Sequence, residues 1–208
     1  MIEYPSINNS SKAPRKECLA FNKLDGSNVR FKWTQKQGFC NYGTRTQLID
    51  ETTPYWGQIV TVFNNTLKAP LDEFFRKSKD YRDSREIICF GEFFDLDSFA
   101  GRHSEKDKKI VIFDVLLGHK QRKLVLPQQF IKDFSFIETP EVVYRGMLND
   151  SFIESVRNSE ILNEGVICKG VERSGAAFGG VWMAKIKTRK YFDRLRGEFP
   201  DDYNKYWE

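Results

Sequence analysis

Histidine and cysteine are scarce in this sequence, and neither occurs at spacings that suit a metal site or a catalytic triad. The 208 residues include 2 His and 4 Cys, namely His103, His119, Cys18, Cys40, Cys89 and Cys168. No CxxC pair is present, so we expect neither a structural zinc site nor a His-based triad. Most of the cysteines lie in apolar stretches. They are therefore expected to be small buried thiols of a reducing compartment.

Long hydrophobic runs and targeting segments are also absent. The N-terminus has no signal-peptide pattern, and the most apolar stretch, KIVIFDVLLG, is short and interrupted by Asp114. No repeat and no Pro- or Ser-rich linker divides the chain. We expect a cytoplasmic protein, of cellular, phage or viral origin, that has no membrane partner.

The composition that remains is that of a folded protein. Hydrophobic residues make up 40% of the chain and charged residues 30%, which excludes a disordered chain. Aromatic residues make up 14%, including 18 Phe, enough for an aromatic core or an aromatic cleft. The net charge of +4 permits a polyanionic partner without requiring one.

The hydrophobic pattern predicts a mixed α+β fold with much antiparallel sheet. Val29, Phe31 and Trp33 alternate with polar residues, as in a half-buried strand. Strands are predicted over 18–23, 28–34, 38–42, 86–95, 108–117, 141–146, 164–170 and 180–188. Helices are predicted over 55–79 (divided near Pro70), 127–134 and 148–158, and from Lys190 onward. Residues 101–108 and 171–180 are expected to be loops.

The stretch KLDGSN, residues 23–28, places a lysine at the end of an apolar run. Lysine is rarely buried, so one interpretation is a solvated strand end followed by a turn at Asp25-Gly26. The other interpretation is a nucleophilic lysine at the mouth of a pocket. The stretch alone does not distinguish them.

Further short motifs follow KLDGSN in a fixed order. They are YGTRT (42–46), FGEFFD (90–95), VIFDV (111–115), EGVICK (164–169) and AKIK (184–187). In this order the sequence resembles the covalent nucleotidyltransferase superfamily of ATP-dependent DNA and RNA ligases and mRNA capping enzymes. Ser27-Asn28 and the EYPSI start resemble most the branch of the phage nick-sealing RNA ligase. The resemblance implies an ATP-grasp-like ligase domain built on antiparallel sheets flanked by helices.

The implied reaction is attack by the amine of Lys23 on the α-phosphorus of a nucleoside triphosphate, with pyrophosphate as the leaving group. A protonated lysine has no lone pair, so its pKa must be lowered by desolvation or by nearby positive charge. Lys185 and Lys187 are the other expected catalytic residues. They would supply that charge and neutralise the α-phosphate in the transition state.

The resemblance also assigns nucleotide-binding roles. Glu92 and Arg45 would hold the ribose and the phosphates, Phe113 would stack on the purine, and Asp25-Gly26 would turn the chain so that Lys23 faces the cleft. Related RNA ligases carry a base-contacting glutamate directly before the nucleophile, whereas this sequence has Asn22, which both donates and accepts hydrogen bonds. Adenine is favoured, but the choice between ATP and GTP stays open. The expected nucleotide-binding set is Asn22, Lys23, Arg45, Glu92, Phe113, Glu164, Lys169, Lys185 and Lys187.

A divalent metal, Mg²⁺ or Mn²⁺, is the expected cofactor beside ATP. Mg²⁺ usually keeps several waters and takes few carboxylates, with Glu164 as the first candidate ligand and Glu92 as the second. Lys169 follows Glu164 at an odd offset, which in a regular strand puts two side chains on opposite faces. We therefore expect either a bulge or only one of these two residues at the nucleotide.

The predicted function is ATP-dependent RNA ligation. The enzyme would form a Lys23–AMP phosphoramidate, transfer AMP to a 5′-phosphate, and let a 3′-OH displace the AMP. The expected partner is RNA with 5′-phosphate and 3′-OH ends, including nicked duplexes and DNA/RNA hybrids, and the expected state is a monomer. A capping-type mRNA guanylyltransferase, an ATP-dependent DNA ligase and a non-catalytic RNA-binding protein stay open as alternatives.

The lengths on either side of the motifs predict the domain organisation. Residues 188–208 are too few for the OB-fold domain of DNA ligases and capping enzymes. We therefore expect one nucleotidyltransferase domain over residues 1–208, without an OB-fold or other C-terminal domain. Residues 1–22 leave no room for a nicotinamide-binding domain, which favours a triphosphate as the nucleotide donor.

Overall fold

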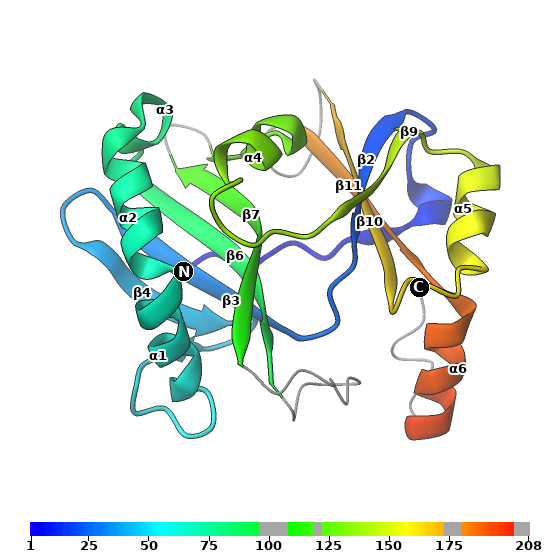
Figure 1. The fold of residues 1–208 in the computed structure, drawn as a ribbon, viewed down its shortest axis with the longest axis horizontal. Helices are drawn as coiled ribbons and strands as arrows, with labels where there is room; N and C mark the ends of the chain where they lie inside the picture. The colour runs from blue at the N-terminus through cyan, green and yellow to red at the C-terminus, as the bar shows by residue number, and fades with distance from the viewer. Residues whose placement is uncertain (96–107, 119–121, 173–179, 202–208) are drawn as a thin grey trace. The chain divides into compact units, whose positions relative to one another are not determined.

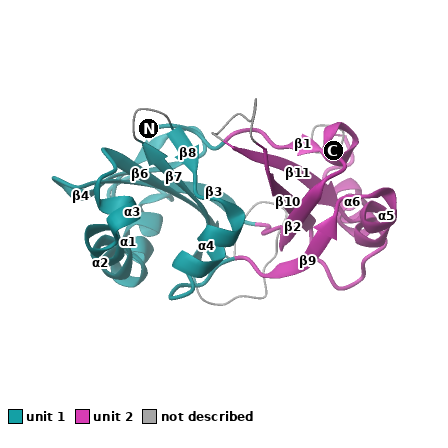
Figure 2. Cartoon of the chain, turned by 90° about the horizontal axis from the view of Figure 1, so that it is seen from above, with its two compact units in different colours: residues 1–4, 26–139 teal, residues 5–25, 140–208 magenta. Residues whose placement is uncertain are grey.

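The computed structural model describes residues 1–95, 108–118, 122–172 and 180–201. The chain divides into two units, coloured separately in Figure 2. Unit 1 contains Met1–Tyr4 and Gly26–Thr139, and unit 2 contains Pro5–Asp25 and Pro140–Glu208. The chain therefore passes from unit 2 to unit 1 directly after Asp25.

Unit 1 is built on a six-stranded antiparallel sheet (Figure 1). Its order is β5 (Leu48–Ile49), β4 (Gly38–Thr44), β3 (Ser27–Thr34), β6 (Glu86–Phe94), β7 (Lys109–Gly118) and β8 (Arg122–Leu124). The alternation predicted for β3 is confirmed, because Val29, Phe31 and Trp33 are fully buried. Asn28, which precedes Val29, and Arg30, which follows it, project from the opposite face.

Helices cover the apolar face of this sheet (Figure 2). The helices described in unit 1 are α1 (Gly57–Thr66), α2 (Lys68–Lys77), α3 (Lys79–Arg82) and α4 (Pro127–Asp133). Phe63 of α1 stacks on Phe31 with ring centroids 3.9 Å apart. Phe75 of α2 meets the ring of Trp33 edge-on at 5.5 Å. Much of the phenylalanine in the composition thus fills this core.

The division of the predicted helix 55–79 is confirmed, and it falls just before the proline. α1 ends at Thr66 and α2 begins at Lys68, so Pro70 lies in the first turn of α2. A proline is tolerated there because the first N–H groups of a helix have no intrahelical acceptor. It cannot donate to the carbonyl of Thr66, which ends the hydrogen-bond ladder of α1.

Unit 2 is built on a five-stranded sheet. Its order is β1 (Asn8–Asn9), β11 (Val181–Lys187), β10 (Gly165–Val171), β2 (Glu17–Asn22) and β9 (Val142–Met147). β1 pairs with β11 in parallel, and the other pairs are antiparallel. The short helix η1 (Ser10–Lys12), α5 (Asp150–Arg157) and α6 (Arg189–Glu198) complete the described elements of this unit.

One face of this second sheet packs on α5. Ala20 of β2 and Val166 of β10 are fully buried against Ile153 and Val156 of the helix. Because side chains alternate along a strand, Phe21 and its neighbours on that side project from the opposite face. α5 begins at Asp150 and is capped by Asn149, whose side chain accepts a hydrogen bond from the N–H of Phe152 at 2.8 Å.

The predicted α+β class with antiparallel sheets is confirmed. Each predicted strand and helix is present with ends shifted by a few residues. Most of the two predicted loops, 101–108 and 171–180, lies outside the described residues. The strand predicted from residue 164 starts at Gly165, which matters for the site below.

The four cysteines are free thiols, and three of them are buried. Burial raises the pKa of the Cys89 thiol. No helix in the described part of the chain combines the length and the hydropathy that a membrane span requires.

Candidate active site

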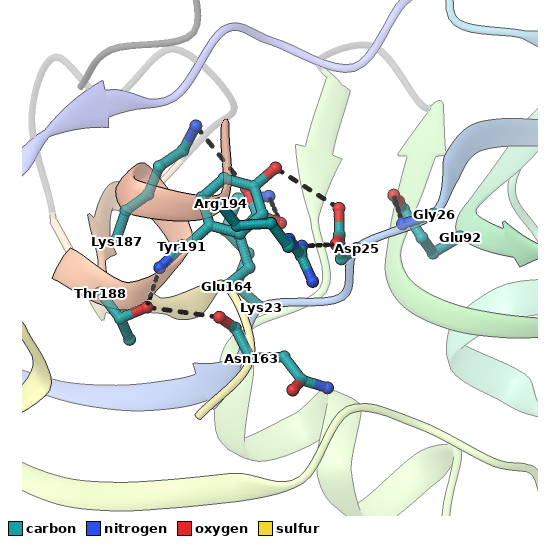
Figure 3. A network of polar contacts seen from close by, with 10 residues as sticks. All are labelled: Lys23, Asp25, Gly26, Glu92, Asn163, Glu164, Lys187, Thr188, Tyr191 and Arg194. Carbon is teal, nitrogen blue, oxygen red and sulfur yellow. Dashed lines mark hydrogen bonds and ion pairs between the residues drawn. The ribbon is translucent and has the colours of Figure 1, made fainter. Parts of the chain in front are cut away.

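Lys23 lies at the end of β2 and faces a carboxylate (Figure 3). Its backbone N–H donates to the carbonyl of Gly165 at 2.9 Å, which continues the pairing of β2 with β10. Its Nζ lies 2.5 Å from Oε2 of Glu164, and 22% of its side chain is exposed. Lys23 is therefore not an ordinary solvated residue at a strand end, and its amine is still partly accessible to solvent.

Glu164 is a buried carboxylate shared by two lysines. Oε2 contacts Lys23, and Oε1 lies 3.7 Å from Nζ of Lys187. The Glu164 side chain is 4% exposed, and its backbone carbonyl accepts a hydrogen bond from the N–H of Thr188 at 2.9 Å. A buried charge is tolerated only when it is paired, so these three side chains form one electrostatic group.

The backbone at Gly165 explains how Glu164 reaches this position. Gly165 has φ +143°, in a region that disfavours side chains, and a Cβ there would lie 2.0 Å from the carbonyl oxygen of Ile186. The regular strand β10 starts only at Gly165, so Glu164 precedes it. The alternation that separates Glu164 from Lys169 in a regular strand therefore does not apply.

The lysines of the two last motifs share one face of the sheet of unit 2. Residues directly opposite each other in an antiparallel pair point to the same side. Gly165 pairs with Lys187, and Ile167 pairs with Lys185, so both lysines project on the side of Ile167. Lys169 follows Ile167 by two positions and has the same orientation. The face of the sheet that turns away from α5 is thus strongly basic.

Lys169 is buried on this face, 4% exposed, and its Nζ lies 4.9 Å from the ring centroid of Phe21. Burial over an aromatic ring is a favourable environment for an ammonium group. Of the two alternatives expected for Glu164 and Lys169, the irregular backbone at Gly165 favours the first, a strand that departs from regular alternation.

Helix α6 packs against Lys187 through two aromatic rings. Thr188 caps the helix by accepting a hydrogen bond from the N–H of Tyr191 at 3.1 Å. The Nζ of Lys187 lies 5.1 Å from the ring centroid of Tyr191 and 5.8 Å from that of Phe192. The aromatic rings and Glu164 together compensate the burial of this cation.

The same helix binds Asp25, in the loop after Lys23 (Figure 3). Arg194 forms an ion pair with the Asp25 carboxylate, and the hydroxyl of Tyr191 donates to Asp25 Oδ1 at 3.4 Å. Burial is the main cause that raises the pKa of Tyr191 above its usual range, and the nearby carboxylates of Glu164 and Asp25 add to it. Sequence reasoning assigned no role to Tyr191 or Arg194.

In unit 1, Glu92 binds the backbone of the same loop. Its Oε1 accepts a hydrogen bond from the N–H of Gly26 at 3.0 Å. A Cβ at Gly26 would lie 2.5 Å from the carbonyl oxygen of Phe93, so only glycine allows β6 to approach so closely. Glu92 projects from the face of the sheet that turns away from α1 and α2.

Phe113 lies on the same face of this sheet as Glu92, at a β-bulge in β7 that places Asp114 on that face as well. The register of β6 with β7 shifts after Phe90, and Phe113 is the extra residue. Ile112 and Val115 both belong to the core, so Phe113 and Asp114 project together from the opposite face. Bulges re-aim side chains in this way near functional sites. Sequence alternation alone cannot predict it.

Tyr4 packs against Phe113 in unit 1. Their ring centroids lie 5.0 Å apart at 78°, and Tyr4 meets Phe90 at 5.0 Å and 61°. Its hydroxyl donates to the Asp114 carboxylate. Burial first, and Asp114 second, raise the pKa of the Tyr4 hydroxyl well above its usual value. Tyr4 thus supports the ring that sequence reasoning selected.

Asn22 and Arg45 are the remaining residues of the predicted set. The N–H of Asn22 donates to the carbonyl of Glu141 at 2.8 Å. The side-chain Oδ1 of Asn22 is buried and has no hydrogen-bond partner among the described residues. Arg45 is exposed in the turn between β4 and β5. Of the predicted residues, Lys23 and Lys187 each contact Glu164, and the contacts given above for the described residues bring none of the others into this group.

The predicted metal ligands are hard oxygen donors, which suit Mg²⁺ or Mn²⁺. Among the described residues, no group of three or more His, Cys, Asp or Glu side chains clusters as a metal site would require. A site for Mg²⁺ needs fewer, since this ion is commonly held by one or two carboxylates together with substrate phosphates. Glu164 fits that role only when one of its oxygens leaves a lysine.

A comparison with protein families matches residues 16–187 to the RNA ligase family. The chain belongs to the RNA ligase family. The match begins just before β2 and ends at Lys187, so it includes all the motifs identified in the sequence. A search of curated protein sequences finds no match for this member of the family.

Solved structures with the same fold include other RNA ligases. A Naegleria gruberi RNA ligase with PPi superposes with a TM-score of 0.68 at 14% identity, over 95% of this chain and 58% of that one. An archaeal ATP-dependent RNA ligase superposes with a TM-score of 0.65 at 14% identity, over 96% of this chain and 52% of that one. The likeness confirms the fold of a ligase nucleotidyltransferase, and the chain spans just over half the length of these structures.

Proposed function

We propose that this member of the RNA ligase family is an ATP-dependent enzyme that joins RNA ends through a covalent Lys23–AMP intermediate. The observation that supports the proposal most is the contact of Lys23 and Lys187 with one buried carboxylate, Glu164. An amine held in a charged group and still partly exposed suits a nucleophile better than a structural lysine does.

The first step would join Nζ of Lys23 to the α-phosphorus of ATP while the bond to pyrophosphate breaks. Nζ must first give up a proton, and Glu164 Oε2, at 2.5 Å, is placed to accept it.

Lys187, Lys185 and Lys169 would bind the phosphates. They occupy one face of the sheet of unit 2, and two of them, Lys187 and Lys169, are buried. Ammonium groups that are already desolvated stabilise developing negative charge on phosphate oxygens with little reorganisation. Lys185 and Lys187 are the two we propose at the α-phosphate.

The other predicted residues are proposed to contact the base, the ribose and the phosphates. Phe113 is proposed to stack on adenine, Glu92 to bind the ribose, and Arg45 to bind phosphates. The buried Oδ1 of Asn22, which has no partner within the described residues, would accept a hydrogen bond from the adenine amino group. Guanine carries an acceptor where adenine carries that amino group.

We propose Glu164 and Glu92 as the residues that hold a divalent cation. Structures of the Naegleria gruberi enzyme are described with ATP and Mn and with AMP and Mn. When bound, such a cation supplies positive charge that offsets the charge of the phosphates and favours the neutral amine.

The proposed substrate is RNA with a 5′-phosphate and a 3′-OH, including nicked duplexes and DNA/RNA hybrids. AMP would move from Lys23 to the 5′-phosphate, and the 3′-OH would displace it. The unpaired thiols suit a reducing, cytoplasmic environment. We further propose that the chain acts as a monomer and that residues 1–208 constitute one nucleotidyltransferase domain.

The test is adduct formation with labelled nucleotide and Mg²⁺. Label from ATP should appear on the protein, Lys23→Ala should abolish it, and Lys77→Ala, at an exposed lysine of α2, should retain it. Label from GTP alone would indicate a guanylyltransferase, and an adduct on Lys23→Ala would remove the proposal. Sealing of matched nicks with RNA or DNA ends then separates an RNA ligase from a DNA ligase.

A further inference from the structure

Helix α6 carries two side chains that bind the loop after the proposed nucleophile. Arg194 pairs with the carboxylate of Asp25, and the hydroxyl of Tyr191 reaches the same carboxylate at 3.4 Å. Asp25 is buried, 8% exposed, and lies two positions after Lys23. These contacts therefore act directly on the segment that carries the amine (Figure 3).

The other arginines of α6 make ordinary surface pairs. Arg189 pairs with Glu154 of α5 at 2.5 Å, and Arg196 pairs with a neighbour on its own helix at 3.3 Å. All these groups are substantially exposed, and such pairs contribute little to stability. The pair of Arg194 differs because its carboxylate is buried and belongs to a catalytic motif.

Tyr191 links two motifs through one ring. Its hydroxyl contacts Asp25, while Nζ of Lys187 lies 5.1 Å from its ring centroid and Cζ of Arg194 lies 4.9 Å from it. Tyr191 is 4% exposed, so the ring has little freedom to move. A shift of this ring would displace Asp25 and Lys187 together.

We propose that Tyr191 and Arg194 are positioning residues for the transfer of AMP to Lys23. They hold Asp25, and Glu92 holds the N–H of the next residue, Gly26, so the loop is fixed at two consecutive positions. Neither residue needs to touch the nucleotide. The inference rests on the proposed function, because it concerns the geometry of that reaction.

The expected effects follow from the sensitivity of in-line attack to geometry. A displacement of about 1 Å in a reacting group costs about 100-fold in rate. Loss of a positioning residue should therefore lower the maximal rate of adduct formation and leave the ATP concentration at half-saturation nearly unchanged. A purely structural residue would change melting temperature without this selective effect.

The experiment measures single-turnover adduct formation over a range of ATP concentrations. Arg194→Ala should lower the maximal rate about tenfold or more. Arg194→Lys, which keeps the charge, should recover part of the loss. Arg196→Ala, on the exposed side of the same helix, should match the wild type. Equal maximal rates for Arg194→Ala and Arg196→Ala would overturn the inference.

Variants of Tyr191 and Asp25 test the proposed connection. Tyr191→Phe loses only the hydroxyl and should be slowed less than Tyr191→Leu, which also loses the ring under Lys187. If Arg194 acts through Asp25, the double variant of Asp25→Asn with Arg194→Ala should be no slower than the slower single variant. If the rate losses of the two single variants multiply in the double variant, Arg194 does not act through Asp25.

A second readout keeps this inference separate from the proposed function. The rate at which acetic anhydride acetylates Lys23, located by peptide mass spectrometry, reports the environment of the amine without any nucleotide. In Arg194→Ala the rate of acetylation of Lys23 should rise compared with the wild type, whereas that of the exposed Lys77 in the same sample should stay the same. A wild type that forms no adduct would end the proposed function, whereas unchanged acetylation of Lys23 in Arg194→Ala would end the inference alone.

Discussion

Lys23 and Glu164, which are far apart in the sequence, meet with Nζ and Oε2 2.5 Å apart. The contact depends on two strands that pair side by side, β2 and β10, and on a backbone irregularity at Gly165. The amine that we propose as the nucleophile therefore has a carboxylate oxygen within hydrogen-bond distance.

Glu164→Gln is expected to stop the reaction without removing the side chain. The amide can neither accept a proton nor balance two ammonium groups, so the rate of adduct formation should fall at least about 100-fold. Glu160→Gln changes an exposed acid of the preceding loop and serves as the control. Adduct formation by Glu164→Gln at the wild-type rate would contradict the assigned role.

Phe113→Ala should weaken nucleotide binding more than it slows chemistry. Stacking of a base on an aromatic ring is worth about 1–3 kcal/mol, so the ATP concentration at half-saturation should rise about tenfold or more. Phe136→Ala, at a partly exposed ring elsewhere in unit 1, is the control. An unchanged affinity would show that Phe113 belongs only to the packing around Tyr4.

Gly165→Ala should destabilise the fold around the site. The added Cβ would lie 2.0 Å from the carbonyl oxygen of Ile186, at a φ of +143° that alanine disfavours. We expect a loss of about 3 kcal/mol in the free energy of unfolding, measured by urea denaturation. Gly197→Ala in α6 meets no atom within 4 Å and should instead gain about 0.5–1 kcal/mol. Equal free energies of unfolding for Gly165→Ala and Gly197→Ala would contradict this prediction.

Alkaline pH should destabilise the protein through buried tyrosines. Burial raises the pKa of Tyr4, Tyr81 and Tyr191 above the usual value of about 10. The folded state then keeps these protons when the unfolded state has lost them. Their contribution to stability is therefore constant below about pH 10 and falls as the pH rises further.

Tyrosinate absorbance in the near ultraviolet checks this prediction. Tyr4, Tyr81 and Tyr191 should ionise late, only as the chain unfolds. Replacing any one of these three tyrosines by Phe should lower the absorbance change at this late stage by the contribution of one tyrosine. Reversible ionisation of all tyrosines near pH 10, with native circular dichroism, would show that burial does not protect them.

Much of this architecture could be predicted from the sequence, because it depends on local patterns. The period-2 burial of Val29, Phe31 and Trp33 follows from their alternation, and the split near Pro70 follows from the missing N–H. The order of the motifs indicated the family, which the comparison confirms. These features need no knowledge of distant contacts.

The irregular positions could not be predicted in the same way. The bulge at Phe113 and the positive φ of Gly165 both break the alternation on which strand prediction relies. EGVICK contains a glycine directly after the glutamate, and in retrospect that glycine was the available signal for Gly165. Nothing local in KYFDRLR identified Arg194, because its partner Asp25 lies near the other end of the chain.

The division of unit 2 between the two ends of the sequence also bears on biosynthesis. A nascent chain that has emerged only as far as Thr139 contains all of unit 1, but only residues 5–25 of unit 2. Its Lys23 has neither Glu164 nor Lys187 beside it. We therefore expect a chain that stops at Thr139 to form no adduct with ATP, because two of the residues proposed to act with Lys23 have not yet been synthesised.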